Sequence, residues 1–459
     1  MISFLHGVEV TETNVGPTPV TVVNSAVIGI VGAAPVFAQP GIPNPWNPNG
    51  AYSVGNKVLD SAMNVQQCTV AGTTGNSAPT WGTALNALTT DGTVTWKLVQ
   101  LANAAPNGVG SLNQPILVNG ANDAANFGPA VQGYLLPYAL AQIQALNAGQ
   151  IIAVNVFNPF TDNTVVSNQS ASMPASGPQY VNLGHMGVLN LVVQNSGKTI
   201  TYVYGTDYTV DHENGIVWAK SGGAITTGEA LNLSYSYASL TNVNDTAIIG
   251  AVTAGVYTGM QCWKLAMSLF GFAPKILIAP GFSQDQTTSN ALDSIAALLG
   301  AMAITDSMPS TPVSTALSNR SLSSSAFSIS SYRTILAFPN QLVEDTGLVP
   351  TGVTVNSLGT VQQATASGLV DLPYSPFVAG VMSNNDINNG YWYSPSNKTF
   401  TGPSGPDVNL YASFTDPASD TNNLNAQGIM TVFNQGSSGM RTWGNRSSAY
   451  PTNTVPQTF

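Results

Sequence analysis

Residues 275–282 read KILIAPGF, a short apolar run that is closed by Pro and Gly. Runs of the same kind recur at 302–307 (MAITDS) and 333–339 (RTILAFP), and helical spacing lies at 290–299 between the first two. Unbroken apolar strands that alternate with helices are typical of a mostly parallel sheet covered by helices. These segments predict an α/β core.

The same alternation appears nearer the N-terminus. Residues 25–35 (SAVIGIVGAAP) and 151–159 (IIAVNVFNP) are apolar runs of strand length. Between them, residues 129–150 carry apolar side chains at the three-four spacing of an amphipathic helix. A further short helix is expected at 361–366. The discontinuous core domain is predicted to comprise 25–45, 102–174 and 240–440.

Two β-rich stretches interrupt this core. The first, 46–101, is rich in Gly, Thr, Ser and Asn, and its segment 89–99 (TTDGTVTWKLV) is typical of a turn followed by an alternating strand. The second, 175–239, contains Asn214-Gly215 between two alternating runs, the strongest short signal for a hairpin. The fold prediction is a multi-domain chain: an α/β core with two inserted small all-β modules, the second of them sandwich-like.

The first insert contains four aromatic side chains that could serve either of two roles. Tryptophan and tyrosine faces stack on the apolar faces of sugars, so an exposed set would form a carbohydrate-binding platform. The favoured interpretation is that they form the core of a small β module. The four residues are Trp46, Tyr52, Trp81 and Trp96.

The chain of 459 residues is long enough for several domains. Residues 1–24 contain Pro17 and Pro19 and nothing that closes a local hairpin, so we expect an extended N-terminal arm. The apolar window 20–38 contains Asn, Pro and many β-branched residues, which favour a buried strand and turn over a membrane span. No secretory signal is recognisable, which predicts synthesis in a cytoplasm.

Charged residues make up only 7% of the chain and apolar residues 43%, which excludes a disordered chain. The surface must consist largely of Ser, Thr, Asn, Gly and backbone, as in β-rich proteins of dense assemblies. A net charge of −10 argues against direct binding to nucleic acid or to an anionic membrane surface. Cys68 and Cys262 fit neither a disulfide framework nor a metal spacing.

No motif in the sequence predicts catalysis, a metal or a cofactor. Residues 197–199 (GKT) lack the first glycine of a phosphate-binding loop, and no G-x-S-x-G elbow marks a nucleophile. Residues 211–213 (Asp-His-Glu) would point to alternating faces of a strand, so we interpret them as a solvated turn. Beyond the carboxyl ends of the strands, where α/β proteins bind ligands, only Asp306 can titrate usefully. The other residues expected there are Asn158, Gly281 and Asn340.

Five segments taken in order resemble the tail sheath proteins of contractile-tailed bacteriophages and related contractile particles. They are HGVEVTE (6–12), VIGIVGAAP (27–35), YWYSPSNKT (391–399), LNAQGIMTVF (424–433) and RTWGNRSSAYPTN (441–453). The most specific landmark residues are Ser394, Pro395, Ser396, Asn397, Lys398, Trp443, Gly444, Asn445 and Arg446. The two inserts are expected to fall outside the shared core.

The resemblance implies a structural subunit, not an enzyme. Copies of the chain would polymerise helically around a tail tube and contract to drive the tube through the host envelope. The resemblance also implies that the arm adds a strand to a sheet of a neighbouring subunit; the residues expected to do so are His6, Gly7, Val8, Glu9 and Val10. The implied partners are the tail tube protein, the baseplate and the tail terminator. The implied location is the virion tail, assembled in the host cytoplasm.

In this family the chain continues past the last landmark into a C-terminal α/β domain that faces the tube. We therefore expect 441–459 to be the start of a truncated domain. The alternative function is a phage baseplate or fibre-associated carbohydrate-binding protein built on the β modules. Neither reading requires a cofactor, nucleic acid or a direct lipid anchor.

Overall fold

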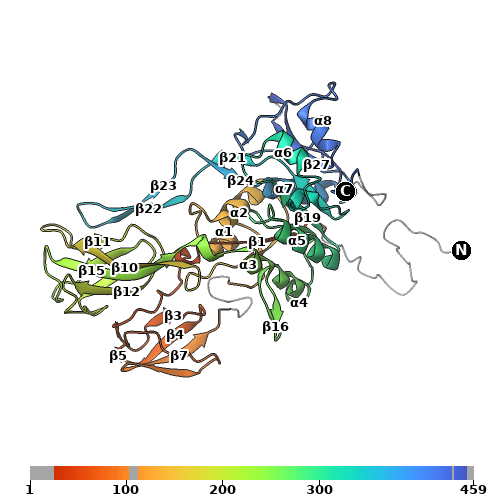
Figure 1. Cartoon of the computed structure of the whole chain (residues 1–459). Helices are drawn as coiled ribbons and strands as arrows, with labels where there is room; N and C mark the ends of the chain where they lie inside the picture. The colour runs from red at the N-terminus through yellow and green to blue at the C-terminus, as the bar shows by residue number, and fades with distance from the viewer. Residues whose placement is uncertain (1–24, 103–111, 437–438, 452–459) are drawn as a thin grey trace, which may run out of the picture.

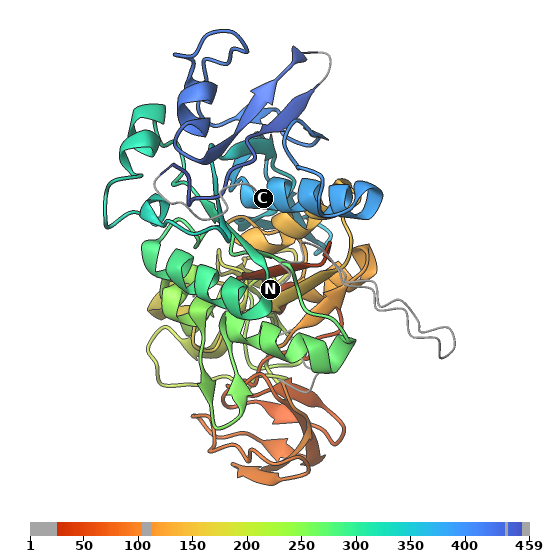
Figure 2. The same cartoon turned by 90° about the vertical axis from the view of Figure 1, so that its right-hand side faces the viewer.

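The computed structural model describes residues 25–102, 112–436 and 439–451. The predicted arm, 1–24, lies outside these ranges. Figure 1 shows an α/β core from which two small β modules project, one near the start of the chain and one formed by the following yellow-green segment. Figure 2 shows the first of them, in orange, below the core. The chain therefore folds into several domains, built from one large mixed sheet with helices and a set of small sheets.

The centre of the described core is a nine-stranded sheet. In sheet order its strands are β25 (Thr399–Phe400), β28 (Met440–Trp443), β27 (Ile429–Asn434), β20 (Thr334–Ala337), β19 (Met302–Asp306), β18 (Ile276–Ile278), β1 (Ile28–Gly32), β9 (Ile151–Asn155) and β8 (Ile116–Val118). Neighbours from β27 to β9 pair in parallel, whereas β8, β28 and β25 pair antiparallel at the edges. The apolar runs that predicted strands lie in the parallel part.

Helices cover both faces of this sheet because successive strand residues are buried on opposite sides. Ile28 and Ile30 belong to a core cluster with side chains of α2 (Leu135–Ala145) and α7 (Ser375–Asn389). Val27 and Val31 belong to a second cluster with η4 (Gly259–Leu265) and α5 (Gln286–Leu299). The other helical segments are η1 (Val36–Ala38), α1 (Ala121–Ala124), η2 (Ala125–Phe127), η3 (Leu240–Asn242), α3 (Asp245–Ile249), α4 (Ala266–Phe270), α6 (Val313–Ser318), η5 (Ala326–Ser328) and α8 (Asp420–Asn425).

The first module is a small β fold around a four-stranded antiparallel sheet. Its strands are β3 (Lys57–Leu59), β4 (Val65–Val70), β7 (Val94–Gln100) and β6 (Leu88–Asp91), with β2 (Ala51–Tyr52) and β5 (Gly72–Thr73) paired beside them. The predicted turn joins β6 to β7, and Gly92 adopts a φ of +59° there. This conformation favours glycine, which explains the Asp-Gly pair in the sequence.

The second module consists of two three-stranded sheets that share one apolar core. One contains β10 (Asn163–Ser172), β15 (Ala230–Ala238) and β12 (Val188–Asn195); the other contains β11 (Tyr180–Asn182), β14 (Ile216–Ala219) and β13 (Tyr208–Asp211). Asn214-Gly215 closes the hairpin between β13 and β14. Because β10 pairs along β15, the module begins near residue 163, so the boundary predicted at 175 is too late.

The helix expected at 361–366 is wrong. This segment is β23 (Val361–Thr365), which forms a long hairpin with β22 (Leu348–Val355). Asn356 closes the hairpin, because its Oδ1 accepts hydrogen bonds from the backbone N–H groups of Leu358 and Thr360 at 2.9 and 3.0 Å. Tertiary pairing thus overrides the helix preference of Gln and Ala. The hairpin extends towards the second module (Figure 1), where Asn182 Nδ2 donates to Val353 O at 2.7 Å.

The predicted boundary at 440/441 falls inside β28, which pairs with β27 in the central sheet. Residues 441–443 therefore belong to the core, not to a separate domain. Two further small sheets complete the described fold: β24 (Leu369–Leu372), β21 (Gln341–Glu344) and β26 (Gly405–Pro406) form one, and β16 (Val252–Thr253) and β17 (Val256–Tyr257) form the other.

Candidate assembly surfaces

The two landmark segments, 394–398 and 443–446, lie side by side. Asn397 N donates to Thr442 O at 2.6 Å, and Thr442 N donates to Lys398 O at 3.0 Å. Ser396 Oγ accepts a hydrogen bond from Gly444 N at 3.1 Å. These bonds extend the pairing of β25 with β28. Two motifs far apart in sequence thus form one continuous part of the sheet edge.

Three aromatic rings stack next to this edge. The ring of Phe414 lies 4.4 Å from that of Phe433 between centroids, and Trp443 lies 5.0 Å from Phe433. Phe414 nevertheless remains 61% exposed. The sequence reasoning did not select Phe414, because a single aromatic residue in a polar loop carries no periodic signal.

A partly buried arginine, Arg320, fixes the segment that follows β28. The guanidinium of Arg320 donates five hydrogen bonds to backbone carbonyl groups. The acceptors are the carbonyl oxygens of Phe327, Ile329, Gln427, Ser448 and Tyr450. Burial lowers the pKa of Arg320, and the carbonyl dipoles offset part of the cost of burying its charge. The side chain thereby ties residues 448–450 to the core.

An exposed run of aromatics, Tyr391, Trp392 and Tyr393, follows α7 and is called the aromatic ridge below. Trp392 is 72% exposed, and the ring of Tyr391 packs edge-on against it at 5.2 Å. The sequence analysis treated these residues only as part of a family landmark. Three consecutive aromatic residues after Gly390 in a polar segment were the signal for an exposed surface. The predicted interaction residues of the arm, His6 to Val10, lie outside the described residues.

The aromatic platform considered for the first module is absent. Trp46 and Trp96 are buried, and both donate from Nε1 to Asp91 Oδ2, at 2.7 and 3.0 Å. Tyr52 is also buried and packs edge-on against Trp96, while Trp81 is partly buried beside them. The four residues therefore form the core of the module, as the favoured interpretation held.

Asp306 holds the carboxyl end of the central sheet together. Its carboxylate is fully buried and accepts hydrogen bonds from Ser283 Oγ at 2.8 Å, Ser375 N at 2.7 Å and Ser375 Oγ at 2.6 Å. Burial raises its pKa to about 6. Because Ser375 begins α7, the carboxylate also faces the positive end of that helix. Asp306 therefore joins α7 to β19.

A pair of carboxyl groups lies beside Asn340, at a position where the sequence analysis expected no acid pair. Asp371 of β24 and Asp407, just after β26, are in mutual contact, and Asp407 Oδ2 accepts from Ser310 N at 2.6 Å. Burial, together with the neighbouring Asp371, raises the pKa of Asp407 to about 6. Sequence reasoning missed this pair because the small sheet, not sequence proximity, brings the two residues together.

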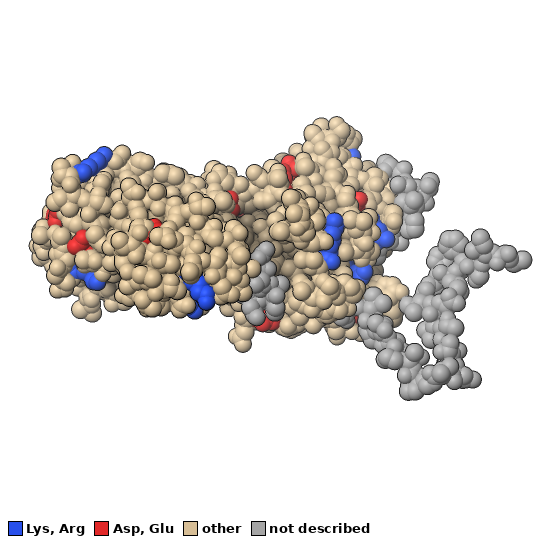
Figure 3. All heavy atoms as spheres, turned by 90° about the horizontal axis from the view of Figure 1, so that it is seen from below, with Lys and Arg blue, Asp and Glu red and all other residues tan. Residues whose placement is uncertain are grey.

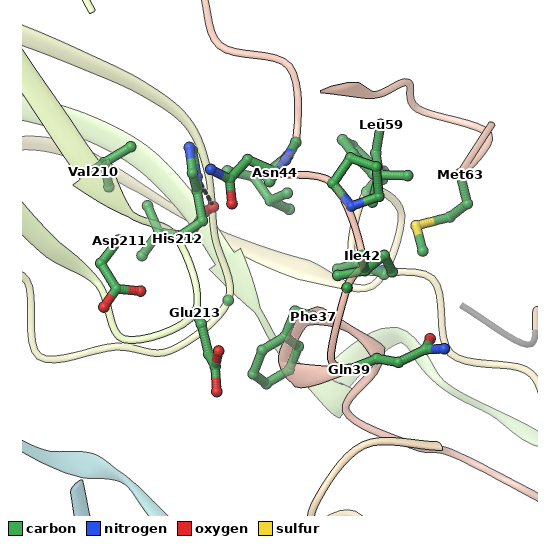
Figure 4. Close-up of a pocket in the computed structure, with 18 of the residues that line it drawn as sticks. Phe37, Gln39, Ile42, Asn44, Leu59, Met63, Val210, Asp211, His212 and Glu213 are labelled. Atoms are coloured by element: carbon green, nitrogen blue, oxygen red, sulfur yellow. Dashed lines mark hydrogen bonds between the residues drawn. The ribbon is translucent and has the colours of Figure 1, made fainter. Parts of the chain in front are cut away.

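A hollow of 310 Å³ lies where the core loop 37–45 meets both modules. Figure 4 shows Leu59 and Met63 of the first module on one side and residues 210–213 of the second on the other. The side chains of Asp211 and Glu213 point away from the ring of His212 (Figure 4), so the three do not converge. The hollow therefore offers no set of ligands for a metal.

His212 is buried, so its interpretation as part of a solvated turn is wrong. Its Nδ1 lies 2.8 Å from the carbonyl oxygen of Val188. Burial lowers its pKa to about 4, which keeps the ring neutral and lets Nδ1–H donate to that carbonyl. The residue stabilises the module instead of binding a ligand.

Within the described ranges, no group of three or more His, Cys, Asp or Glu side chains is arranged to hold a metal ion. In the same part of the chain, every helix is too short or too polar to cross a bilayer. Lys and Arg are sparse on the face shown in Figure 3, in line with the low charge of the sequence.

Comparison with known proteins gives the family. The model of the phage tail sheath protein central domain matches residues 255–448, and a model of a protein of unknown function matches residues 160–246. The tail sheath protein of Burkholderia phage BcepMu is 32% identical over 460 residues, a match that covers 100% of this chain and 77% of that protein. The chain belongs to the phage tail sheath family.

A second relative of this sheath protein is the putative prophage major tail sheath protein of Pseudomonas aeruginosa strain UCBPP-PA14. It is 30% identical over 202 residues, covering 44% of this chain and 45% of that protein. Among solved structures, the helical sheath of the anti-feeding prophage in its contracted state is similar. The match covers 83% of this chain and 67% of the sheath chain, with 12% sequence identity and a TM-score of 0.40. The membership in the tail sheath family makes the protein a structural subunit of a phage tail sheath and a component of the virion tail.

The match to the Burkholderia phage protein runs through both β modules, so these inserts align between the two proteins. The model of the sheath central domain matches 255–448 and covers neither module. The separate family model that matches 160–246 fits the second module as the structure bounds it, starting near residue 163 and not at 175.

Proposed function

We propose that this sheath subunit polymerises helically around a tail tube and contracts to drive the tube through the host envelope. The observation that carries the proposal is the 32% identity to a phage tail sheath protein along the whole chain. A surface poor in charge supports dense packing of copies, because few ions must lose their water shell in each contact. No enzymatic activity, nucleotide or cofactor is part of the proposal.

The partners we propose are copies of the chain, a tail tube protein, the baseplate and the tail terminator. Contacts between unlike surfaces that do not close on themselves produce an open helix. Contraction is then a cooperative change between two packings of rigid subunits, with its energy stored during assembly in the host cytoplasm. Rigidity is supported by the β22–β23 hairpin, which hydrogen-bonds the second module to the core.

The proposed role of the N-terminal arm is strand donation to a neighbouring subunit, through His6, Gly7, Val8, Glu9 and Val10. An extended segment that pairs with another chain satisfies its backbone groups there. Deletion of residues 1–20 is expected to abolish tubes in electron micrographs of the assembled protein. Normal tubes from the shortened chain would overturn strand donation but not the sheath function.

The experiment that tests the function is electron microscopy of the source particle labelled with an antibody against residues 163–238. Label at regular intervals along the whole tail is expected. Label confined to the tail tip would overturn the proposal in favour of a baseplate or fibre protein. The carbohydrate-binding alternative has lost its main support, because the aromatic residues of the first module are internal.

A further inference from the structure

The aromatic ridge borders a hollow of 380 Å³ at the amino end of the central sheet. Ile276 and Met302 line the hollow from the starts of β18 and β19, and Met382 lines it from α7. Tyr391 and Tyr393 of the ridge form its rim. An apolar hollow with exposed aromatics at its rim has the composition of the centre of a protein–protein contact.

Positive charge exceeds negative charge around this hollow. Lys275 and Arg333 line it, and Asp386 is the acidic residue among its lining residues. Lys275 Nζ donates to Leu299 O at 2.6 Å, and Arg333 Nη1 donates to Ala301 O at 3.2 Å. These bonds hold both cations in place at the rim. An occupant of the hollow should therefore combine an aromatic or aliphatic tip with a carboxylate.

The loop before α8 on the same chain has this composition. Phe414 is 61% exposed, although one side of its ring is fixed by stacking on Phe433 at 4.4 Å. Asp416 lies two residues further on, and its carboxylate accepts a hydrogen bond from Tyr411 OH at 2.8 Å. Residues 411–420 contain Asp416 and Asp420 and no Lys or Arg. A fixed side chain loses little freedom on binding.

We propose that Phe414 of one copy docks into the hollow beside the aromatic ridge of a second copy, with Asp416 facing Lys275 and Arg333. The inference rests on the proposed function, since it names one contact between copies in the sheath. The two surfaces belong to different parts of the subunit: one follows α7, and the other precedes α8. A contact between unlike surfaces leaves one of each free on every pair, so further subunits can be added, and the chain of contacts extends as a helix where it does not close into a ring.

Cross-linking of two variants, each with one added cysteine at an exposed position, tests the contact. Asn389→Cys stands beside the ridge and Thr415→Cys beside Phe414, and both positions are exposed. A short bis-maleimide reagent is expected to give a dimer when the two variants are mixed and none with either variant alone. The double variant is expected to give a ladder of oligomers. The unmodified chain is the control, because Cys68 and Cys262 are buried.

Charge reversal tests the electrostatic part of the contact. Arg333→Glu should lower the yield of cross-linked dimer about tenfold or more, because it replaces attraction to Asp416 by repulsion between like charges. Asp416→Arg in the other partner should restore it. Trp392→Ala, which leaves all charges in place, should also lower the yield. Thermal unfolding of each variant checks that the fold is retained.

The outcomes separate the inference from the proposed function. If the unmodified chain forms tubes and the mixed variants give no dimer, the docking inference is wrong and the sheath function stands. Dimers formed by either variant alone would mean that like surfaces meet, which also overturns the inference. If the antibody label on the source particle is confined to the tail tip, the proposed function fails.

Discussion

The α/β core and the second β module are organised along the chain in opposite ways. The core sheet collects β1, β9, β18 and β27 from residues 28 to 434, with both modules inserted between them. The second module uses one contiguous stretch, 163–238, whose strands are joined by turns. The core therefore depends on ties between distant segments, whereas the module depends on the conformation of its turns. Substitutions that remove a tie in the core should destabilise the core, and substitutions that strain a turn should destabilise the second module.

The largest expected effect concerns the tie made by Arg320 in the core. Arg320→Met removes the donor from carbonyl groups in a partly buried region, including those of Ser448 and Tyr450. We expect the free energy of unfolding to fall by about 3 kcal/mol or more, because each unsatisfied buried group costs about 1–3 kcal/mol. Urea unfolding measures the loss. Hydrogen exchange should rise around residues 440–451 and stay unchanged in the second module.

Arg441→Met is the matched control for this substitution. Arg441 also donates to a backbone carbonyl, that of Asn397, but this bond is exposed. Exposed polar contacts contribute about 0–1 kcal/mol, so the control should lose far less stability. Equal losses for the two variants would mean that the carbonyl groups around Arg320 are satisfied in another way.

The next effect concerns a turn of the second module. Gly215 has a φ of +66°, and a Cβ added there would overlap the carbonyl oxygen of His185. Gly215→Ala should therefore destabilise the module by about 2–3 kcal/mol through strain and overlap. Gly228 has a φ of +75° with open space around it, so Gly228→Ala should cost only about 1 kcal/mol. Hydrogen exchange of 163–238 measures both, and an equal loss would show that overlap is unimportant.

Mild acid should affect the two regions in opposite directions, and His212 decides the response of the module. Its folded pKa of about 4 lies below the ordinary value of 6.5, so the unfolded chain binds the proton more readily. Stability from His212 is present above pH 6.5 and is lost as pH falls towards 4. Between pH 7 and 5 the module should lose about 2 kcal/mol. His212→Gln should flatten this dependence.

In the core, Asp306 should give the opposite sign. Its folded pKa of about 6 lies above the ordinary value of 3.8, so the folded chain binds the proton more readily. Its contribution is present below pH 3.8 and is lost as pH rises through 6. Between pH 7 and 5 the core should therefore gain about 1 kcal/mol. Asp306→Asn should remove this gain, and hydrogen exchange at both pH values separates the two regions.

The core was more predictable from the sequence than the modules. The run KILIAPGF and its counterparts are apolar without alternation, and such runs become strands buried on both faces wherever they lie in the chain. The start of the second module could not be found at Asn163, because β10 is largely exposed and its pairing with β15 depends on tertiary structure. The helix expected at 361–366 failed for the same reason.

The candidate surfaces were only partly predictable. The landmark residues at 394–398 and 443–446 were identified as segments, but nothing in the sequence showed that they pair across the sheet edge. Arg320 could not be found, because its partners are backbone carbonyls, which leave no pattern of side chains. Phe414 and the acid pair Asp371–Asp407 require contacts between distant segments, and these follow from topology rather than from local spacing.

The smallest expected effect on the folded subunit belongs to Trp392, which supports neither the core nor the module. Its side chain is 72% exposed, so Trp392→Ala should change the free energy of unfolding by less than about 0.5 kcal/mol. Urea unfolding measures this, with buried Trp263→Ala, expected to lose about 3–5 kcal/mol, as the contrast. A large loss for Trp392→Ala would mean that the ridge serves the fold. A negligible loss together with failed cross-linking would assign this tryptophan to contacts between copies, since an exposed aromatic residue that does not stabilise its own subunit is free to bind another.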